Sequence, residues 1–128
     1  MSNVYTPEEW MLVKIEGSDP HYRIFGSWRG GYTTGDSWRM NSGITRFTMS
    51  EDSYYEFHGF SGSVYVVHPK QYGIGSPWNA GVLNQYIQTG AGHIGVIEEC
   101  PTKEELLNFD WKIKPPFFTP EEKDIANG

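Results

Sequence analysis

Residues 22–29 have the sequence YRIFGSWR, in which large apolar side chains recur at alternate positions. Tyr22, Ile24 and Trp28 fall on one face of an extended chain, whereas Phe25 falls on the other face with polar neighbours. Successive side chains of a strand point to opposite faces, so this period of two predicts a β-strand. We therefore expect residues 22–29 to form a strand, with neighbouring strands supplied by the sequence on either side.

Other segments have the composition of strands. Each is short, rich in β-branched or aromatic residues, and bounded by residues that favour turns. They are residues 10–15, 38–49, 54–60 and 64–68, with residues 92–98 as the last candidate. Ser42-Gly43 interrupts the segment 38–49 and predicts a bulge or bend there. This close spacing of strands predicts an antiparallel sheet.

One segment has the pattern of a longer helix. Ser76 is a helix cap, Pro77 suits the first helical position, and Gly90 marks the end. The apolar side chains between them fall on one helical stripe, namely Trp78, Val82, Leu83, Tyr86 and Ile87. A capping box at residues 102–105 predicts a second, short helix, and residues 6–9 predict a brief helical turn before the first strand.

The predicted fold class is α+β. We expect a single domain over residues 1–114, with a twisted antiparallel sheet of about five strands and one main helix packed on it. A chain of 128 residues is long enough to bury its own core and suits one domain. Residues 115–128 begin with Pro-Pro and carry an acidic run, which predicts an extended or frayed acidic tail.

The composition excludes several classes of protein. Aromatic residues make up 16% of the chain, which excludes a fully disordered chain. No stretch approaches the ~18 apolar residues of a membrane helix. Cys100 is the single cysteine, so no internal disulfide or thiolate metal cluster is expected. No basic region followed by an apolar block opens the chain, so we expect no signal peptide and a cytoplasmic location.

The charge is unevenly distributed. A net charge of −6 opposes direct binding to DNA or RNA, which requires clustered Lys and Arg. Residues 20–50 nevertheless contain all four arginines, Arg23, Arg29, Arg39 and Arg46, together with one acid, Asp36. These arginines are either part of a solvated face or form an anion site, because guanidinium grips phosphate and carboxylate in a bidentate manner.

Residues 27–43 are the most unusual segment, because aromatic, arginine and glycine residues are concentrated there. Such a mixture supplies stacking faces, hydrogen-bond donors and a backbone that can approach a ligand. We therefore expect the ligand-binding or partner-binding residues to be Arg29, Tyr32, Asp36, Trp38 and Arg39. The alternative is that the tryptophans are core, Arg29 or Arg39 pairs with Asp36, and the glycines shape a hairpin.

Signals for catalysis are weaker. The best catalytic set is Asp36, Arg39 and His58 or His68, and no spacing in the sequence forces these residues together. Residues 73–77 lead into a helix start that favours anions, but no lysine follows the glycines as in a phosphate loop. The histidines lack metal-ligand spacing and Cys100 follows two glutamates, so we expect no metal, no cofactor and no catalytic thiol.

Three short segments resemble sequences of one group of proteins. These are SW at residues 27–28, GDSWRMNSGI at residues 35–44 and SGSVY at residues 61–65. On them the chain resembles small uncharacterised accessory proteins of large tailed bacteriophages, over roughly residues 10–75. The resemblance names no family and carries over no catalytic residue. It implies an accessory protein made in the cytoplasm of the infected bacterium, where such proteins neutralise host components or sequester signalling nucleotides.

These observations lead to a functional expectation with two alternatives. We expect a non-enzymatic binding protein, an inhibitor that acts on a host protein through the loop rich in Arg, Gly and aromatic residues. The first alternative is a protein that sequesters an anionic small molecule such as a nucleotide. The second is a small hydrolase that uses Asp36, Arg39 and His58 or His68. An aromatic-rich edge strand would also permit a homodimer.

Overall fold

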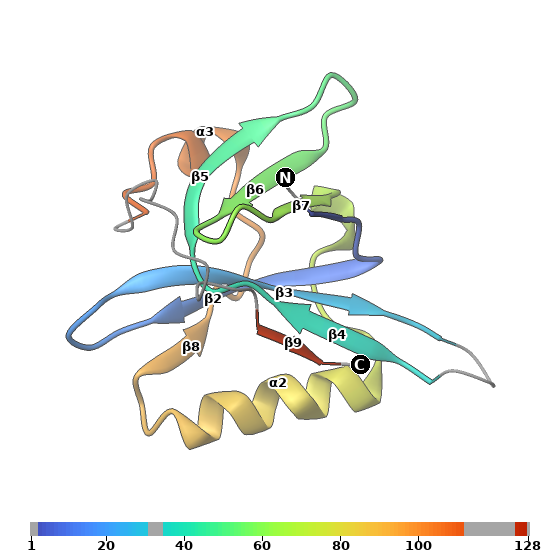
Figure 1. The fold of residues 1–128 in the computed structure, drawn as a ribbon, viewed down its shortest axis with the longest axis vertical. Coiled ribbons are helices and arrows are strands. Elements are labelled where there is room, and N and C mark those ends of the chain that lie inside the picture. Colours follow the sequence, from blue (N-terminus) through green and yellow to red (C-terminus); the bar gives the residue numbers. More distant parts are fainter. Residues whose placement is uncertain (1–2, 31–34, 112–124, 128) are drawn as a thin grey trace.

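The computed structural model describes residues 3–30 and 35–111 in full, and residues 125–127 by their backbone. The protein has three layers: a four-stranded sheet, a five-stranded sheet and the main helix α2 (Pro77–Thr89) (Figure 1). The five-stranded sheet is the central layer, with α2 on one side and the smaller sheet on the other (Figure 1). The α+β class is therefore confirmed. Within the described residues, no helix is both long and apolar enough to cross a membrane.

The central sheet is antiparallel throughout. Its strand order is β8 (Ile94–Val96), β2 (Glu9–Ile15), β3 (His21–Trp28), β4 (Ser37–Met40) and β9 (Ile125–Asn127). The predicted strand at residues 22–29 is β3, which lies at the centre of this order. It pairs with the whole of β2, from Glu9 opposite Ser27 to Ile15 opposite His21.

The smaller sheet accounts for a difference from the predicted single sheet of about five strands. Its order is β1 (Val4–Tyr5), β7 (Val64–Val67), β6 (Tyr55–Gly59) and β5 (Ile44–Met49), and β1 runs parallel to β7. The chain changes sheets at the predicted bend after β4. There the side-chain Oδ1 of Asn41 accepts from the Ile24 nitrogen at 3.0 Å. Gly43 follows with a φ of 151°, which favours glycine.

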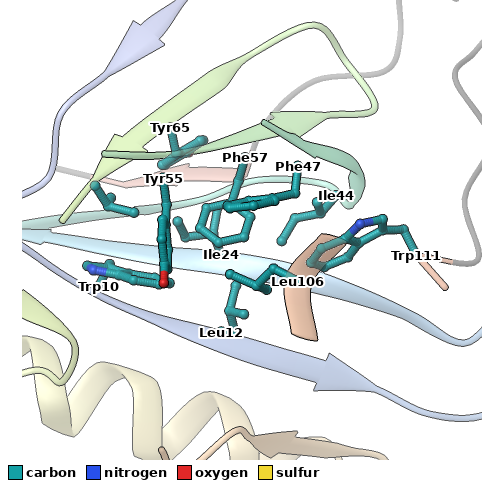
Figure 2. Packing of buried hydrophobic residues seen from close by; sticks show 11 residues of the cluster. Trp10, Leu12, Ile24, Ile44, Phe47, Tyr55, Phe57, Tyr65, Leu106 and Trp111 are labelled. Atoms are coloured by element: carbon teal, nitrogen blue, oxygen red, sulfur yellow. The ribbon is translucent and has the colours of Figure 1, made fainter. Parts of the chain in front are cut away.

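Side chains of the central strands point alternately to the two faces of the sheet, and a hydrophobic core lies on each face. Between the sheets, Trp10, Leu12 and Ile24 of the central sheet pack against aromatic residues of the smaller sheet such as Tyr55 and Phe57 (Figure 2). On the opposite face of the central sheet, Val13, Phe25 and Met40 pack against Leu83 of α2. Both faces of the central sheet are thus buried, which fixes the register of its strands.

The helices begin and end close to the predicted residues. Ser76 caps α2 by accepting from the Asn79 nitrogen at 3.2 Å, which confirms the main helix. The capping box of Thr102 and Glu105 opens α3 (Lys103–Leu107). A short 3₁₀ helix, η1 (Pro69–Gln71), follows β7.

The start of the chain differs from the prediction, and most of the predicted tail lies outside the described residues. Residues 6–9 form no helical turn, because they connect β1, which ends at Tyr5, to β2, which begins at Glu9. The side chains of Glu8 and Glu9 accept hydrogen bonds from other parts of the chain. The predicted acidic tail at residues 115–128 lies largely outside the described residues. Its residues Ile125–Asn127 form β9, which pairs with β4 at the edge of the central sheet (Figure 1).

Candidate functional site at the loop end of the central sheet

Three segments meet at one end of the central sheet. They are the start of β2, the connection from β3 to β4, and residues 73–76, which lead into α2. We call the surface that they form the loop-end surface. Its members are Glu8, Glu9, Arg29, Asp36 and Gly75, and Trp78 follows them in the first turn of α2.

Two neighbouring glutamates join these segments. The side-chain Oε1 of Glu8 accepts from the backbone nitrogen of Arg29 at 2.7 Å. Glu9 accepts from the Gly75 nitrogen at 3.0 Å through Oε1, and its Oε2 lies 3.7 Å from the Arg29 guanidinium. The Arg29 side chain remains 52% exposed. These carboxylates therefore position an accessible guanidinium.

Asp36 closes the loop between β3 and β4. Its Oδ1 accepts from the Gly30 nitrogen at 3.2 Å, and its Oδ2 accepts from the Ser76 hydroxyl. The Ser76 hydroxyl, the Gly30 N–H and the nearby Arg29 charge all lower the pKa of Asp36, against a smaller opposing effect of burial. The start of α2, which favours anions, thus holds a carboxylate of the chain itself.

The first turn of α2 is held firmly against the sheet. Asn79 is fully buried, and its Nδ2 donates to the Ser27 hydroxyl and to the Ser37 carbonyl, both at 2.8 Å. The neighbouring Trp78 is 70% exposed. The sequence pattern placed Trp78 on the packed stripe of the helix, and the structure corrects this: at the first turn the buried residue is the polar Asn79.

An open groove lies beside these residues. It has a volume of about 500 Å³. Its lining comprises Glu8, Glu9, Lys70, Gln71, Tyr72, Gly73, Ile74 and Gly75. Since Glu8 and Glu9 also bond to Arg29 and Gly75, the groove and the exposed Arg29 belong to one continuous surface.

The residues predicted for the site are only partly brought together. Arg29 and Asp36 both lie on the loop-end surface. Trp38 packs instead on the α2 side of the central sheet, stacked on Phe25 with ring centroids 5.4 Å apart. Arg39 follows Trp38 in β4, and its guanidinium lies 4.3 Å from the centroid of the Tyr5 ring, in the smaller sheet. Successive residues of a strand point to opposite faces, which separates these two side chains.

Tyr32 lies outside the described residues. The sequence analysis did not include Glu8, Glu9 or Trp78 in the site. The one available signal is the pair of adjacent acids at the start of β2, which the sequence pattern assigns to the first turn of a helix. Trp78 carried no distinguishing signal, because a tryptophan at that spacing is also typical of a packed helix face.

The four arginines lie in separate places. Arg23 donates through Nε to His21 Nε2 at 3.0 Å, and its NH1 lies 3.4 Å from the Tyr86 hydroxyl of α2. Arg29 lies beside Glu9, Arg39 lies over Tyr5, and Arg46 is an exposed residue of β5. No two of them converge on a common anion position in the part of the chain that the structure describes.

The residues of the hydrolase alternative are also dispersed. Asp36 is bonded to Ser76 and Arg39 lies over Tyr5. His58 Nε2 is 2.7 Å from the Thr48 hydroxyl in the smaller sheet, whereas His68 Nδ1 accepts from the Lys70 nitrogen at 3.0 Å. The structure therefore supports no site that combines these four residues.

The cluster around His58 contains a hydroxyl, an imidazole and a carboxylate. Thr48 Oγ1 lies 2.7 Å from both His58 Nε2 and Glu56 Oε1. A hydroxyl has one proton, so when Thr48 donates to the carboxylate it accepts from His58, and the imidazole cannot act as its base. Burial and the Arg46 charge lower the pKa of His58, against an opposing effect of Glu56. This cluster is a cross-strand hydrogen-bond network.

Cys100 is half-buried, and burial raises the pKa of its thiol to about 11. A thiol with so high a pKa is a poor nucleophile at neutral pH. Among the described residues, no group of three or more His, Cys, Asp or Glu side chains is arranged to hold a metal ion.

Comparison with known proteins adds no relative to this description. The chain matches no protein-family model, no curated protein and no solved structure.

Proposed function

We propose that the protein is a non-enzymatic binding module that contacts a protein partner through the loop-end surface. The resemblance to bacteriophage accessory proteins suggests the kind of partner, a host protein of the infected bacterium that the module inhibits. In this proposal the chain acts in the bacterial cytoplasm. The site residues carried over from the sequence analysis are Arg29 and Asp36, with Trp78, Glu8 and Glu9 added.

The observation that carries the proposal is the exposure of Trp78 on a rigid support. Its side chain is 70% exposed, although the next residue, Asn79, is fully buried and bonded to both β3 and β4. Tryptophan and arginine dominate the binding energy of protein interfaces, and a segment whose backbone is already ordered loses less entropy on binding. Trp78 lies three residues after Gly75, which bonds to Glu9 beside Arg29, so both residue types occur at this end of the central sheet.

A protein partner is favoured over an anionic small molecule. The Arg29 guanidinium already lies beside Glu9, and Asp36 occupies the start of α2, so an incoming phosphate would meet two carboxylates. The groove beside them is open and lined in part by Glu8 and Glu9. Small-ligand sites are usually enclosed and bury most of their ligand. An open groove of this kind suits a flatter partner.

The test uses a matched pair of exposed apolar residues. Trp78→Ala removes the tryptophan, and Leu107→Ala changes another exposed apolar residue, 61% exposed, on α3. Affinity capture from a bacterial host lysate identifies candidate partners, and each is then purified and titrated against the three chains. We expect a partner whose affinity falls at least ~30-fold with Trp78→Ala and stays unchanged with Leu107→Ala.

Two outcomes contradict the proposal. One is that every purified partner binds Trp78→Ala as tightly as the unaltered chain. The other is that nucleotides or sugar phosphates raise the melting temperature of the chain, and that Arg29→Ala abolishes this shift. The second outcome would support the sequestering alternative.

A further inference from the structure

The outer edge of β4 is occupied by a very short strand. Three residues of β9 pair with it, and Arg39 lies opposite position 126, which is an alanine in this chain. Figure 1 shows β9 beside β4 at the rim of the central sheet, near the carboxyl end of the chain. A sheet edge exposes unpaired N–H and C=O groups and is a ready template for an added strand.

The ladder bonds between β4 and β9 fall at two positions of β4. The backbone nitrogen of Asn41 donates to the Ile24 carbonyl of β3. Backbone groups of alternate residues in a strand point to the same side, so those of Asn41, Arg39 and Ser37 all point toward β3. The backbone groups of Met40 and Trp38 therefore point the other way, toward Ile125 and Asn127, which lie opposite them. The backbone N–H of position 126 points away from β4.

Arg39 lacks a matched partner across this pairing. It is half-buried, and its guanidinium lies over the Tyr5 ring at 4.3 Å. Among the described residues, no carboxylate forms an ion pair with it. Residues directly opposite each other in an antiparallel pair share a face, and opposite charges there stabilise the pairing. Alanine at position 126 provides no such charge.

We propose that the edge of β4 is a docking site for an extended segment of a partner protein, with Asp or Glu opposite Arg39. In the isolated chain β9 holds this edge, and the partner segment displaces it. The three residues of β9 form few backbone hydrogen bonds with β4, and the conformational entropy lost when β9 becomes ordered offsets part of their stabilisation. A longer partner segment with a matching acid therefore competes effectively with β9 for this edge. This is a second contact, distinct from the loop-end surface, and it does not depend on Trp78.

The experiment uses the full chain with Ile125→Pro, which removes an N–H that bonds to β4. Ala126→Pro is the matched control, because that N–H points away from β4. The probes are two labelled peptides with the sequence of residues 121–128, in which Glu or Gln replaces the alanine at position 126. Binding is measured by fluorescence anisotropy, and circular dichroism and a cooperative melt establish that each variant is folded.

We expect both peptides to bind Ile125→Pro more tightly than Ala126→Pro. We also expect the Glu peptide to bind about two- to fivefold more tightly than the Gln peptide. Adding Arg39→Gln to the chain abolishes this preference, and adding Trp78→Ala leaves it unchanged. The two proposals, the loop-end surface and the β4 edge, can therefore be separated. Trp78→Ala should weaken binding of the partner protein and leave binding of the peptides intact.

Three results overturn the docking site. The peptides fail to bind the folded Ile125→Pro chain, or they bind it no better than Ala126→Pro. Alternatively, the Glu and Gln peptides bind with equal affinity. If light scattering shows that Ile125→Pro forms a dimer, the occupant of the edge is a second copy of this chain and the proposed partner segment is wrong.

Discussion

The hydroxyl oxygen of Tyr72 lies 3.1 Å from the backbone nitrogen of Leu12 and accepts its hydrogen bond. The same hydroxyl donates to the Ile97 carbonyl at 2.5 Å. On this edge of β2, the strand pairs with β8 at residues 13–15 and forms a single bridge from Trp10 to Tyr72. The phenol thus satisfies the Leu12 N–H, which lies between these two pairings and belongs to neither of them.

Tyr72→Phe is therefore expected to destabilise the protein by about 1–3 kcal/mol, because it leaves the Leu12 N–H and the Ile97 carbonyl without this partner. Urea unfolding followed by circular dichroism measures the change. Tyr54→Phe is the control, because Tyr54 is 39% exposed and contacts the His68 ring through its own ring. Equal stabilities of the two variants would show that the phenol bridge contributes nothing.

Because of Tyr72, the free energy of unfolding is also expected to decrease at alkaline pH. Burial raises its pKa from 10.0 to about 12, so the folded protein holds the phenol proton more tightly than the unfolded chain does. This contribution is complete below pH 10 and is lost as the pH rises from 10 to 12. Cys100 titrates with the same sign between pH 9 and about 11, so the measurement is made in a Cys100→Ala chain. Burial also raises the pKa of Tyr55, so adding Tyr72→Phe should reduce the remaining slope of unfolding free energy against pH without abolishing it. An unchanged slope would exclude Tyr72 as a source.

An element of the fold can be predicted from the sequence where a signal within a few residues determines it. The alternation in β3, the cap at Ser76 and the capping box at Thr102 each act within a few residues, and the predicted elements form there. The division into two sheets depends on Asn41, whose side chain accepts from the Ile24 nitrogen 17 residues away. Periodicity within a strand carries no information about such a contact.

The site was less predictable for the same reason. Arg29 and Asp36 are close in sequence and lie on one surface, whereas Glu9 and Gly75 are bonded across 66 residues. Adjacent strand residues such as Trp38 and Arg39 look like a cluster in the sequence, yet they contact different rings, Phe25 and Tyr5. The tertiary arrangement of the segments, rather than composition, selects which of the predicted residues share a surface.

Two glycines provide a matched test of packing. A Cβ added at Gly26 would lie 2.6 Å from Cγ of the buried Pro7, whereas one added at Gly81 in α2 would meet no atom within 4 Å. Gly26→Ala is expected to destabilise the protein by about 1–3 kcal/mol through overpacking. Gly81→Ala is expected to stabilise it by about 0.5–1 kcal/mol, because alanine favours the helix. Thermal and urea unfolding of both variants test these signs, and a neutral Gly26→Ala would mean that β1 and β2 shift freely around Pro7.

Because Asp36 is bonded to Ser76 as a carboxylate, the free energy of unfolding is expected to decrease in acid. The Ser76 hydroxyl and the Gly30 N–H lower the pKa of Asp36 below its ordinary value of 3.8, so the folded state binds this proton less tightly than the unfolded chain. The contribution is present above pH 3.8 and is lost as the pH falls through the lowered pKa. Asp36→Asn should remove this part of the acid dependence and leave the cap of α2 in place.

Ser76→Ala should reduce the same acid dependence, because the Gly30 N–H and the Arg29 charge remain, and should also remove the cap, at a cost of about 1 kcal/mol at neutral pH. Unfolding free energies of the unaltered chain and both variants, measured from neutral pH to pH 2.5, give the comparison. If Asp36→Asn loses stability in acid as steeply as the unaltered chain, another carboxylate governs that region. If Ser76→Ala keeps the whole acid dependence that Asp36→Asn lacks, the Gly30 N–H and the Arg29 charge hold the carboxylate without Ser76, and the β3–β4 loop is closed independently of α2.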